Sequence, residues 1–195
     1  MPLPRSFYSG HTLRVAEKLL GQLLVHNSAE GEIAGRIVEA EAYIGEDDPA
    51  CHAAKGYTPR TAIMYGEPGH AYVYFTYGMH YMFNVVTERK GFPGAVLIRA
   101  VEPIKGIEIM ARHRRRVTDP KNLANGPAKL CQAFRIDRHL NGVDLCRSVL
   151  YVERLSQKGH TSKILWTPRI GISDGLDRHW RCCLAENPYV SHYRP

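Results

Sequence analysis

Hydrophobic and polar residues alternate along residues 33 to 43, which read Ile-Ala-Gly-Arg-Ile-Val-Glu-Ala-Glu-Ala-Tyr. A period of two predicts a β-strand. It places Glu39, Glu41 and Tyr43 on one face, and Val38 with the small apolar residues that follow it on the other. The two carboxylates are either solvated side chains or part of a chemical site, and the pattern alone leaves both interpretations open.

A second stretch, residues 72 to 84, predicts two strands joined by a tight turn. Aromatic and β-branched residues dominate both arms, as is typical of a half-buried pleated surface. Gly78 provides the permissive backbone that a turn needs. Tyr77 beside it is unusual, because small polar residues are normal at a solvated turn.

Residues 95 to 101 form a nearly continuous apolar run, which predicts a strand buried on both faces. Arg99 interrupts this run. A charge in such a strand needs a partner, usually a carboxylate. The alternative is an arginine near the strand's end that reaches water.

The remaining pattern predicts shorter elements. A helix over 12–20 is ended by Gly21, and a long loop over 55–69 carries several prolines and glycines. Gly126-Pro127 is typical of a helix start. The other predicted elements are strands over 22–26, 149–153 and 164–172, and a helix over 104–116.

The chain has 195 residues, of which 44% are hydrophobic, so we expect one domain spanning residues 1–195. The sequence has no apolar run as long as a membrane span and no signal-peptide core at its start, which favours a cytoplasmic location. Five cysteines without a Cys-x-x-Cys pair argue against a disulfide framework or a zinc site. Ten histidines show no metal-ligand spacing.

The formal net charge of +7 favours an anionic partner such as nucleic acid, membrane headgroups or a phosphorylated substrate, although a merely basic soluble protein is the alternative. Residues 112 to 116 include Arg114 and Arg115 in a cluster of basic side chains. This cluster either contacts phosphate or is a solvated helix end. The helix start at Gly126 with Lys129 nearby is either a phosphate seat or a plain structural cap.

Together, these features are consistent with an enzyme that acts on a base in duplex DNA. Such an enzyme extrudes the base and fills the gap, and a tyrosine at a hairpin tip suits that wedge. Aromatic residues such as Tyr43, Tyr74 and His52 could sandwich the base. Cleavage of an N-glycosidic bond needs a carboxylate to activate water, and either Glu41 or Glu39 could serve. A non-catalytic nucleic-acid-binding module and a hydrolase of free nucleosides are the alternatives.

Seven sequence blocks, in order along the chain, resemble the alkyladenine (3-methyladenine) DNA glycosylase family. The main ones are Arg-Ile-Val-Glu-Ala-Glu-Ala-Tyr-Ile-Gly followed by Ala-Cys-His, and the hairpin Tyr-Val-Tyr-Phe-Thr-Tyr-Gly-Met. The others begin at residues 20, 97, 126, 169 and 187. The resemblance implies an α+β fold: a single mixed domain with a curved antiparallel sheet, flanking helices and a protruding β-hairpin.

The resemblance also implies roles for individual residues. Glu41 falls at the general base, Glu39 at a structural position, and Arg99 where it helps hold the attacking water. A backbone carbonyl near Ile172 completes that water site. The base-contacting and DNA-contacting positions are Tyr43, His52, Tyr74, Asn84 (discrimination against guanine) and Tyr77 (intercalation).

The family implies a monofunctional hydrolase that removes damaged purines of the 3-methyladenine, 7-methylguanine, hypoxanthine and ethenoadenine class. It needs no metal or organic cofactor, and it has no Schiff-base lysine for a lyase step. The expected partner is double-stranded DNA containing damaged purines, with no membrane, and the expected state is a monomer found wherever the DNA is. Residues 179 to 183 follow no pattern that we can assign.

Overall fold

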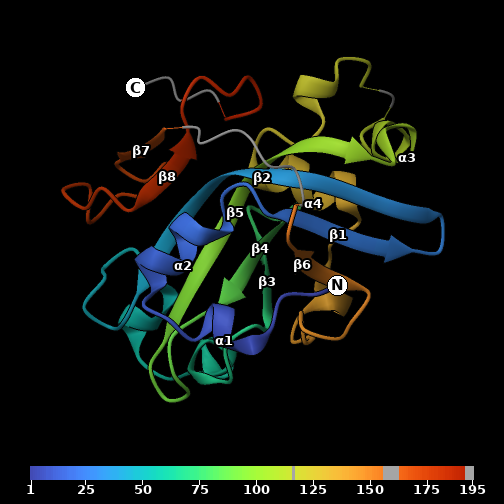
Figure 1. Ribbon diagram of the computed structural model, residues 1–195. Coiled ribbons are helices and arrows are strands. Elements are labelled where there is room, and N and C mark those ends of the chain that lie inside the picture. The colour runs from blue at the N-terminus through green and yellow to red at the C-terminus, as the bar shows by residue number, and fades with distance from the viewer. Residues whose placement is uncertain (116, 156–162, 192–195) are drawn as a thin grey trace.

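The computed structural model describes residues 1–115, 117–155 and 163–191. Its centre is an antiparallel sheet of eight strands in the order β3-β4-β5-β2-β1-β6, with β8 pairing β2 and β7 pairing β8. The sheet curls, and β2 (Gly31–Ile44) is its longest strand (Figure 1). The predicted α+β class with a curved antiparallel sheet is confirmed, whereas the extent of the domain stays a prediction.

The other strands are shorter. They are β1 (Leu23–Ser28), β3 (Ala71–Thr76), β4 (His80–Val86), β5 (Gly94–Lys105), β6 (Leu150–Glu153), β7 (Ile164–Thr167) and β8 (Arg181–Leu184). The α-helices are α1 (Arg5–Tyr8), α2 (Thr12–Leu19), α3 (Ile107–His113) and α4 (Pro127–Phe134). Short 3-10 helices are η1 (His52–Lys55), η2 (Ala62–Tyr65), η3 (Pro120–Asn122) and η4 (Arg138–Leu140).

Three strands pair with β2. Its first half forms a hairpin with β1, and β5 runs along nearly its whole length. β8 pairs with Glu39, Ala40 and Glu41 on part of the remaining edge. Figure 1 shows β1 and β8 beside different parts of β2. The segment that carries both glutamates is therefore enclosed by strands on both sides.

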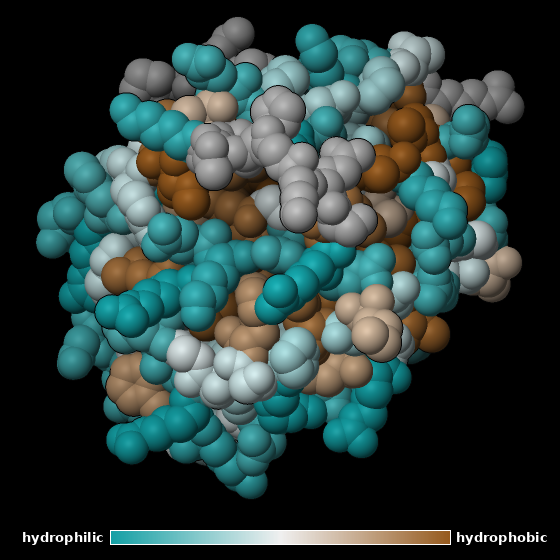
Figure 2. All heavy atoms as spheres, viewed as in Figure 1, coloured by the Kyte–Doolittle hydropathy of each residue, from teal (hydrophilic) through white to brown (hydrophobic). Residues whose placement is uncertain are grey.

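Helices cover the sheet and complete the core. α2 packs against β2 and β5, and α4 packs against β4 and β5. Fully buried side chains such as Leu19, Ile37, Ile98 and Phe134 fill the space between them. Burial of such side chains is the main favourable term in folding. The face seen in Figure 2 is mostly hydrophilic, with hydrophobic side chains reaching the surface in patches.

Two predicted elements are wrong in their bounds. The predicted helix over 104–116 is shorter, since α3 covers only Ile107–His113. It begins late because β5 continues to Lys105 and Gly106 at φ +72° separates strand from helix. The predicted strand over 164–172 ends at Thr167, before Pro168. Its partner is β8, which falls in the segment where the sequence showed no assignable pattern. Arg116 of the basic cluster lies outside the described residues.

No helix within the described ranges is both long enough and apolar enough to cross a membrane. The helix over 12–20 and the hairpin over 72–84 are confirmed, the helix as α2 and the hairpin as β3 and β4. The loop over 55–69 contains η2 and the end of η1 and otherwise lacks regular structure.

Candidate active site

Two carboxylates lie buried side by side on β2. Glu39 and Glu41 are both 0% exposed, so the interpretation of solvated strand residues is wrong. The β2–β5 pairing is irregular here, because Glu39 pairs with Ala100 and Ala40 pairs with Ile98, which leaves Arg99 without a paired residue. Bulges of this kind redirect a side chain and occur often beside functional sites.

Arg99 bridges the two carboxylates. Its Nε donates to Glu39 Oε1 at 3.0 Å, and its Nη1 lies 3.1 Å from Glu41 Oε2. Although burial alone lowers the pKa of Arg99, the negative charges of Glu41 and Glu39 outweigh it and raise that pKa. The arginine in the apolar run is therefore a cation held between two buried anions, and the predicted carboxylate partner is confirmed.

Glu41 has two further donors. The backbone N–H of Ile170 donates to Oε1 at 2.8 Å, and the Tyr43 hydroxyl donates to Oε2 at 2.9 Å. Burial, followed by the charge of Glu41, raises the pKa of Tyr43, so this phenol is a donor at neutral pH. Donors on both oxygens fix the orientation of the carboxylate, as a general base in a buried site requires.

Glu39 is surrounded by more donors than Glu41. Oε1 accepts from Arg181 Nε at 2.6 Å and from the Ser191 hydroxyl at 2.7 Å, and Oε2 accepts from the Ser191 backbone N–H at 2.7 Å. With Arg99 added, both oxygens of Glu39 are satisfied inside the protein. This is consistent with the predicted structural role of Glu39. Sequence reasoning missed Arg181 and Ser191.

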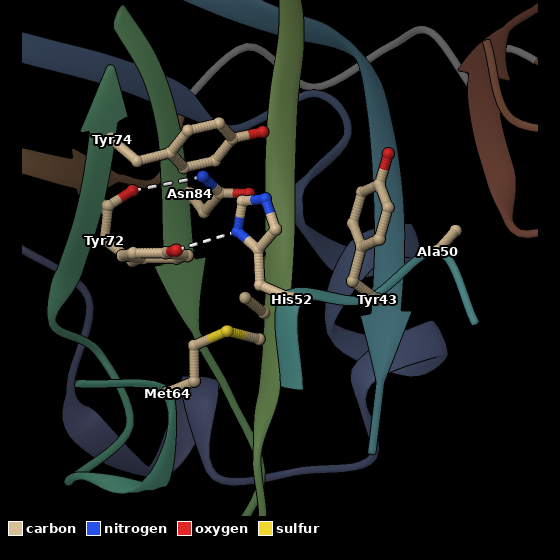
Figure 3. Close-up of a pocket in the computed structure, with 8 residues that line it drawn as sticks. Tyr43, Ala50, His52, Met64, Tyr72, Tyr74 and Asn84 are labelled. Atoms are coloured by element: carbon tan, nitrogen blue, oxygen red, sulfur yellow. Dashed lines mark hydrogen bonds between the residues drawn. The ribbon is translucent and has the colours of Figure 1, made fainter. Parts of the chain in front are cut away.

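A small pocket lies beside Glu41. Tyr43 links the two, because its ring lines the pocket and its hydroxyl donates to Glu41. The pocket has a cavity volume of about 30 Å³ and is lined by aromatic and polar side chains from β2, β3, β4 and the η1 segment. These are Tyr43, His52, Tyr72, Tyr74 and Asn84, with Ala50, Met64 and Ala95 completing the wall. Figure 3 shows His52 between Tyr43 on one side and Tyr72 with Tyr74 on the other. Aromatic walls with a few polar groups are typical of sites that bind planar ring systems.

His52 is held as a neutral ring. Its Nδ1 lies 2.8 Å from the Tyr72 hydroxyl, and its ring meets that of Tyr74 edge-on with centroids 4.6 Å apart. Burial, followed by the charges of Arg60 and Lys55, lowers the pKa of His52 to about 4. Arg60 Nη2 lies 3.3 Å from His52 Nε2, and its guanidinium lies over the Tyr74 ring. The sequence prediction of this site did not include Tyr72 or Arg60.

Asn84 is buried at the pocket wall opposite Tyr72 in the β3–β4 pairing. Its Nδ2 donates to the Tyr72 carbonyl at 3.1 Å (Figure 3). This bond fixes the amide, so the oxygen Oδ1 is the end left to meet a ligand.

Arg169 lies behind Tyr43, and sequence reasoning gave it no role. Its guanidinium is 4.7 Å from the Tyr43 ring centroid and donates to both oxygens of Asp48 at 2.6 and 2.7 Å. This buried ion pair joins the loop after β2, which carries Asp48, to the segment after β7, which carries Arg169. Ile172, two residues after Ile170, makes no side-chain or turn hydrogen bond within the described residues, and its predicted role stays untested.

Tyr77 lies at the tip of the β3–β4 hairpin. Its side chain is 77% exposed, and its φ of +52° with Gly78 at +68° places both turn residues in the left-handed region. Met79 and Phe75 are also exposed there. A bulky residue in this conformation is uncommon and costs free energy. The hairpin therefore presents a large aromatic ring to solvent at the expense of backbone strain.

Three predicted phosphate contacts lie at the ends of α3 and α4, away from the pocket lining. Arg115 is exposed, Arg114 donates to the Leu123 carbonyl and to Gln132, and Lys129 Nζ donates to Asn125 Oδ1 at 2.7 Å. α4 begins at Pro127, as predicted. Across the ranges that the structure describes, no group of three or more His, Cys, Asp or Glu side chains could hold a metal ion.

Comparison with known proteins agrees with the family resemblance found in the sequence. Residues 6–188 match the sequence model of the family described as Methylpurine-DNA glycosylase (MPG). A protein of Methanocella arvoryzae named "Putative 3-methyladenine DNA glycosylase" is 51% identical, covering 99% of this chain and 97% of its own length. Proteins with the same name from Prosthecochloris aestuarii and Chlorobaculum tepidum are 50% and 45% identical, each covering at least 98% of this chain and at least 91% of their own length. The chain belongs to the methylpurine-DNA glycosylase family.

Proposed function

We propose that this protein removes damaged purines from duplex DNA by hydrolysing the N-glycosidic bond, leaving an abasic site. The observation that carries the proposal is the contact between Tyr43 and Glu41. Through it, a buried, oriented carboxylate lies beside a pocket lined by aromatic side chains. The substrates expected are 3-methyladenine, 7-methylguanine, hypoxanthine and ethenoadenine.

Glu41 acts as the general base. A water held against Glu41 gives up a proton to the carboxylate as its oxygen attacks the anomeric carbon of the sugar, and the bond to the purine nitrogen breaks with its electron pair leaving on the base. The negative carboxylate also stabilises the positive charge that develops on the sugar. Arg99 and the Ile170 N–H keep the carboxylate oriented. The carbonyl of Ile172 is proposed as a further contact for the water.

The pocket selects the base by stacking and by steric exclusion. Tyr43, His52 and Tyr74 present ring faces or edges to it, and the pKa of His52 of about 4 keeps that ring uncharged at neutral pH. A purine alkylated at a ring nitrogen is cationic, so uncharged aromatic rings attract it more strongly than a normal base. Asn84 is proposed to exclude normal guanine through a steric clash with the exocyclic amine of that base.

Extrusion of the base is proposed to depend on Tyr77, which enters the stack as the base leaves it. The side chain is exposed and lies at the end of the hairpin whose strand β3 carries Tyr72 and Tyr74. No lysine is among the residues that line the pocket. The proposal includes a monofunctional reaction without a lyase step, which would need an amine to form a Schiff base with the sugar.

The test is single-turnover release of base from a duplex with one hypoxanthine, with DNA rich in 3-methyladenine in parallel. Wild type and Glu41→Gln are compared with Glu102→Gln, a control in which a partly buried glutamate of the same sheet, paired with Arg36, loses its charge. We expect release by wild type and by the control, and loss of at least about a hundredfold in Glu41→Gln with duplex binding retained.

Two other outcomes have defined meanings. Tight, salt-sensitive DNA binding by wild type without base release would contradict the proposal and favour the non-catalytic binding module. Release of bases from free nucleosides but not from DNA would also contradict it and favour a nucleoside hydrolase. Normal release by Glu41→Gln would leave the reaction intact and remove Glu41 as its base.

A further inference from the structure

A stack of alternating aromatic rings and guanidinium groups extends away from the pocket. The Arg169 guanidinium lies 4.7 Å from the centroid of Tyr43 and 5.2 Å from that of Trp180. Arg178 lies on Trp180 at 4.6 Å. Arg169 is therefore in contact with two aromatic rings, one of which lines the candidate active site.

Arg169 is protonated and carries a positive charge in the folded protein. The side chain is 0% exposed, and it makes two hydrogen bonds to Asp48 and one to the Ala42 carbonyl at 3.0 Å. Burial alone lowers the pKa of Arg169, but the hydrogen bonds and the charge of Asp48 outweigh it, and the pKa is raised. Asp48 is itself fully buried and also accepts hydrogen bonds from the backbone N–H groups of Ile44 and Ala50.

The guanidinium lies over the Tyr43 ring and outside the pocket lining, which points to the face of the ring opposite the pocket. Tyr43 lines the pocket, and Arg169 does not. A base in the pocket would meet one face of the Tyr43 ring while Arg169 occupies the other.

We propose that Arg169, balanced by Asp48, sets the preference between cationic and neutral damaged bases through the ring of Tyr43. The proposal rests on the proposed function. A ring attracts a cation through the negative potential of its face, and a cation already on the opposite face opposes the second one. A neutral base pays no such penalty. Arg169 therefore reduces the preference of the aromatic pocket for cationic over neutral purines.

Asp48 determines how strongly the charge of Arg169 opposes a cationic base on the other side of Tyr43. Its carboxylate offsets part of the Arg169 charge, because its two oxygens lie 2.6 and 2.7 Å from the guanidinium nitrogens. Loss of the Asp48 charge would leave Arg169 unbalanced behind Tyr43. Loss of both charges together would remove the cation that lies on the Tyr43 ring. Arg178, 3.7 Å from Asp48, lies on Trp180 instead. The two changes should therefore alter selectivity in opposite directions.

The experiment measures the ratio of single-turnover rates for 7-methylguanine, which is cationic, and hypoxanthine, which is neutral, each in a duplex. Relative to wild type, we expect the ratio to fall at least about threefold in Asp48→Asn and to rise at least about threefold in the double variant Arg169→Gln with Asp48→Asn. Arg169→Lys retains the charge, and its ratio should stay near that of wild type even where both rates fall.

A purely structural role would slow both substrates equally, so unchanged ratios in Asp48→Asn and in the double variant would overturn the proposal. Changes of the same sign in both variants would also overturn it. The ratio is measured on folded protein, with thermal unfolding as the check. If wild type releases neither base, the proposed function fails; if wild type releases both and the ratios do not move, only the role of Arg169 fails.

Discussion

Arg99 holds Glu41 and Glu39 together, with one guanidinium nitrogen 3.1 Å from Glu41 Oε2 and another 3.0 Å from Glu39 Oε1. The three side chains are almost completely buried. The two carboxylates differ in how far they rely on Arg99 for a compensating positive charge. Glu39 also pairs with Arg181, whereas the other donors to Glu41 are the uncharged Tyr43 hydroxyl and Ile170 N–H.

Replacement of Arg99 by methionine should therefore destabilise the protein strongly. It leaves the Glu41 carboxylate buried without a cation, and breaking a buried pair in this way costs about 3–5 kcal/mol. Urea unfolding at pH 7 measures the loss of free energy of unfolding. The control is Arg36→Met, which breaks the partly exposed pair with Glu102 between the same two strands and should cost about 1 kcal/mol or less. Similar losses in both variants would contradict the role given to Arg99.

Protonation of His52 should destabilise the fold in acid. Its pKa is lowered from 6.5 to about 4, chiefly by burial. Between these two values the unfolded chain binds a proton that the folded protein excludes, so the free energy of unfolding should fall as pH falls from 6.5 to 4. In His52→Gln this dependence should be weaker, and in the exposed control His139→Gln it should match wild type. Parallel slopes for wild type and His52→Gln would show that the imidazole titrates normally.

The same property bears on catalysis. An imidazole that stays neutral down to about pH 5 adds no positive charge to the pocket, so base release should show no step from His52 between pH 6 and pH 8.

Much of the site could be predicted from local pattern. The period of two placed Glu39, Glu41 and Tyr43 on one face of β2, and the arginine in the apolar run implied a carboxylate partner, which the structure confirms. The hairpin followed from its aromatic arms and Gly78. In each case the signal lies within a few residues along the chain.

The remainder depends on contacts distant in sequence. Alternation shows which residues share a face but not which face is covered, and Glu39 is covered by Arg181 and Ser191, 142 and 152 residues further along. The Arg169 pair with Asp48 spans 121 residues. β8 is only four residues long, and its sequence Arg-Cys-Cys-Leu is buried throughout, so it shows no alternation that would predict a strand.

Replacement of Tyr77 by asparagine should separate DNA recognition from stability. Asparagine accepts the left-handed backbone better than tyrosine, and the lost side chain is mostly exposed, so thermal stability should stay the same or rise slightly. Affinity for a lesion-containing duplex should fall at least about tenfold, since stacking on a base is worth about 1–3 kcal/mol. Fluorescence anisotropy measures the affinity, with Phe75→Ser, another exposed aromatic of this hairpin, as the control. Unchanged lesion affinity would remove Tyr77 as the wedge.

The basic side chains near α3 and α4 should differ in their contribution to DNA binding. Arg114 has its Nε and Nη1 engaged with Leu123 and Gln132, whereas the Arg115 side chain is exposed and makes no hydrogen bond to any described residue. Arg115→Gln should weaken binding of damaged and undamaged duplex alike. It should also reduce the slope of log affinity against log salt by about 0.9, the value for one lost phosphate contact.

Lys129→Gln tests the predicted phosphate seat at the start of α4 in the same assay. Its ammonium group already donates to Asn125, and burial, followed by the charge of Arg114, lowers its pKa. These properties describe a cation that is positioned but not neutralised by an anion, so we expect a slope change like that of Arg115→Gln. The control is Arg147→Gln, an exposed arginine paired with Asp144. The change in the salt slope of Arg147→Gln could equal that of the other two variants. That result would mean that the protein attracts DNA through its net charge rather than through the basic side chains near α3 and α4.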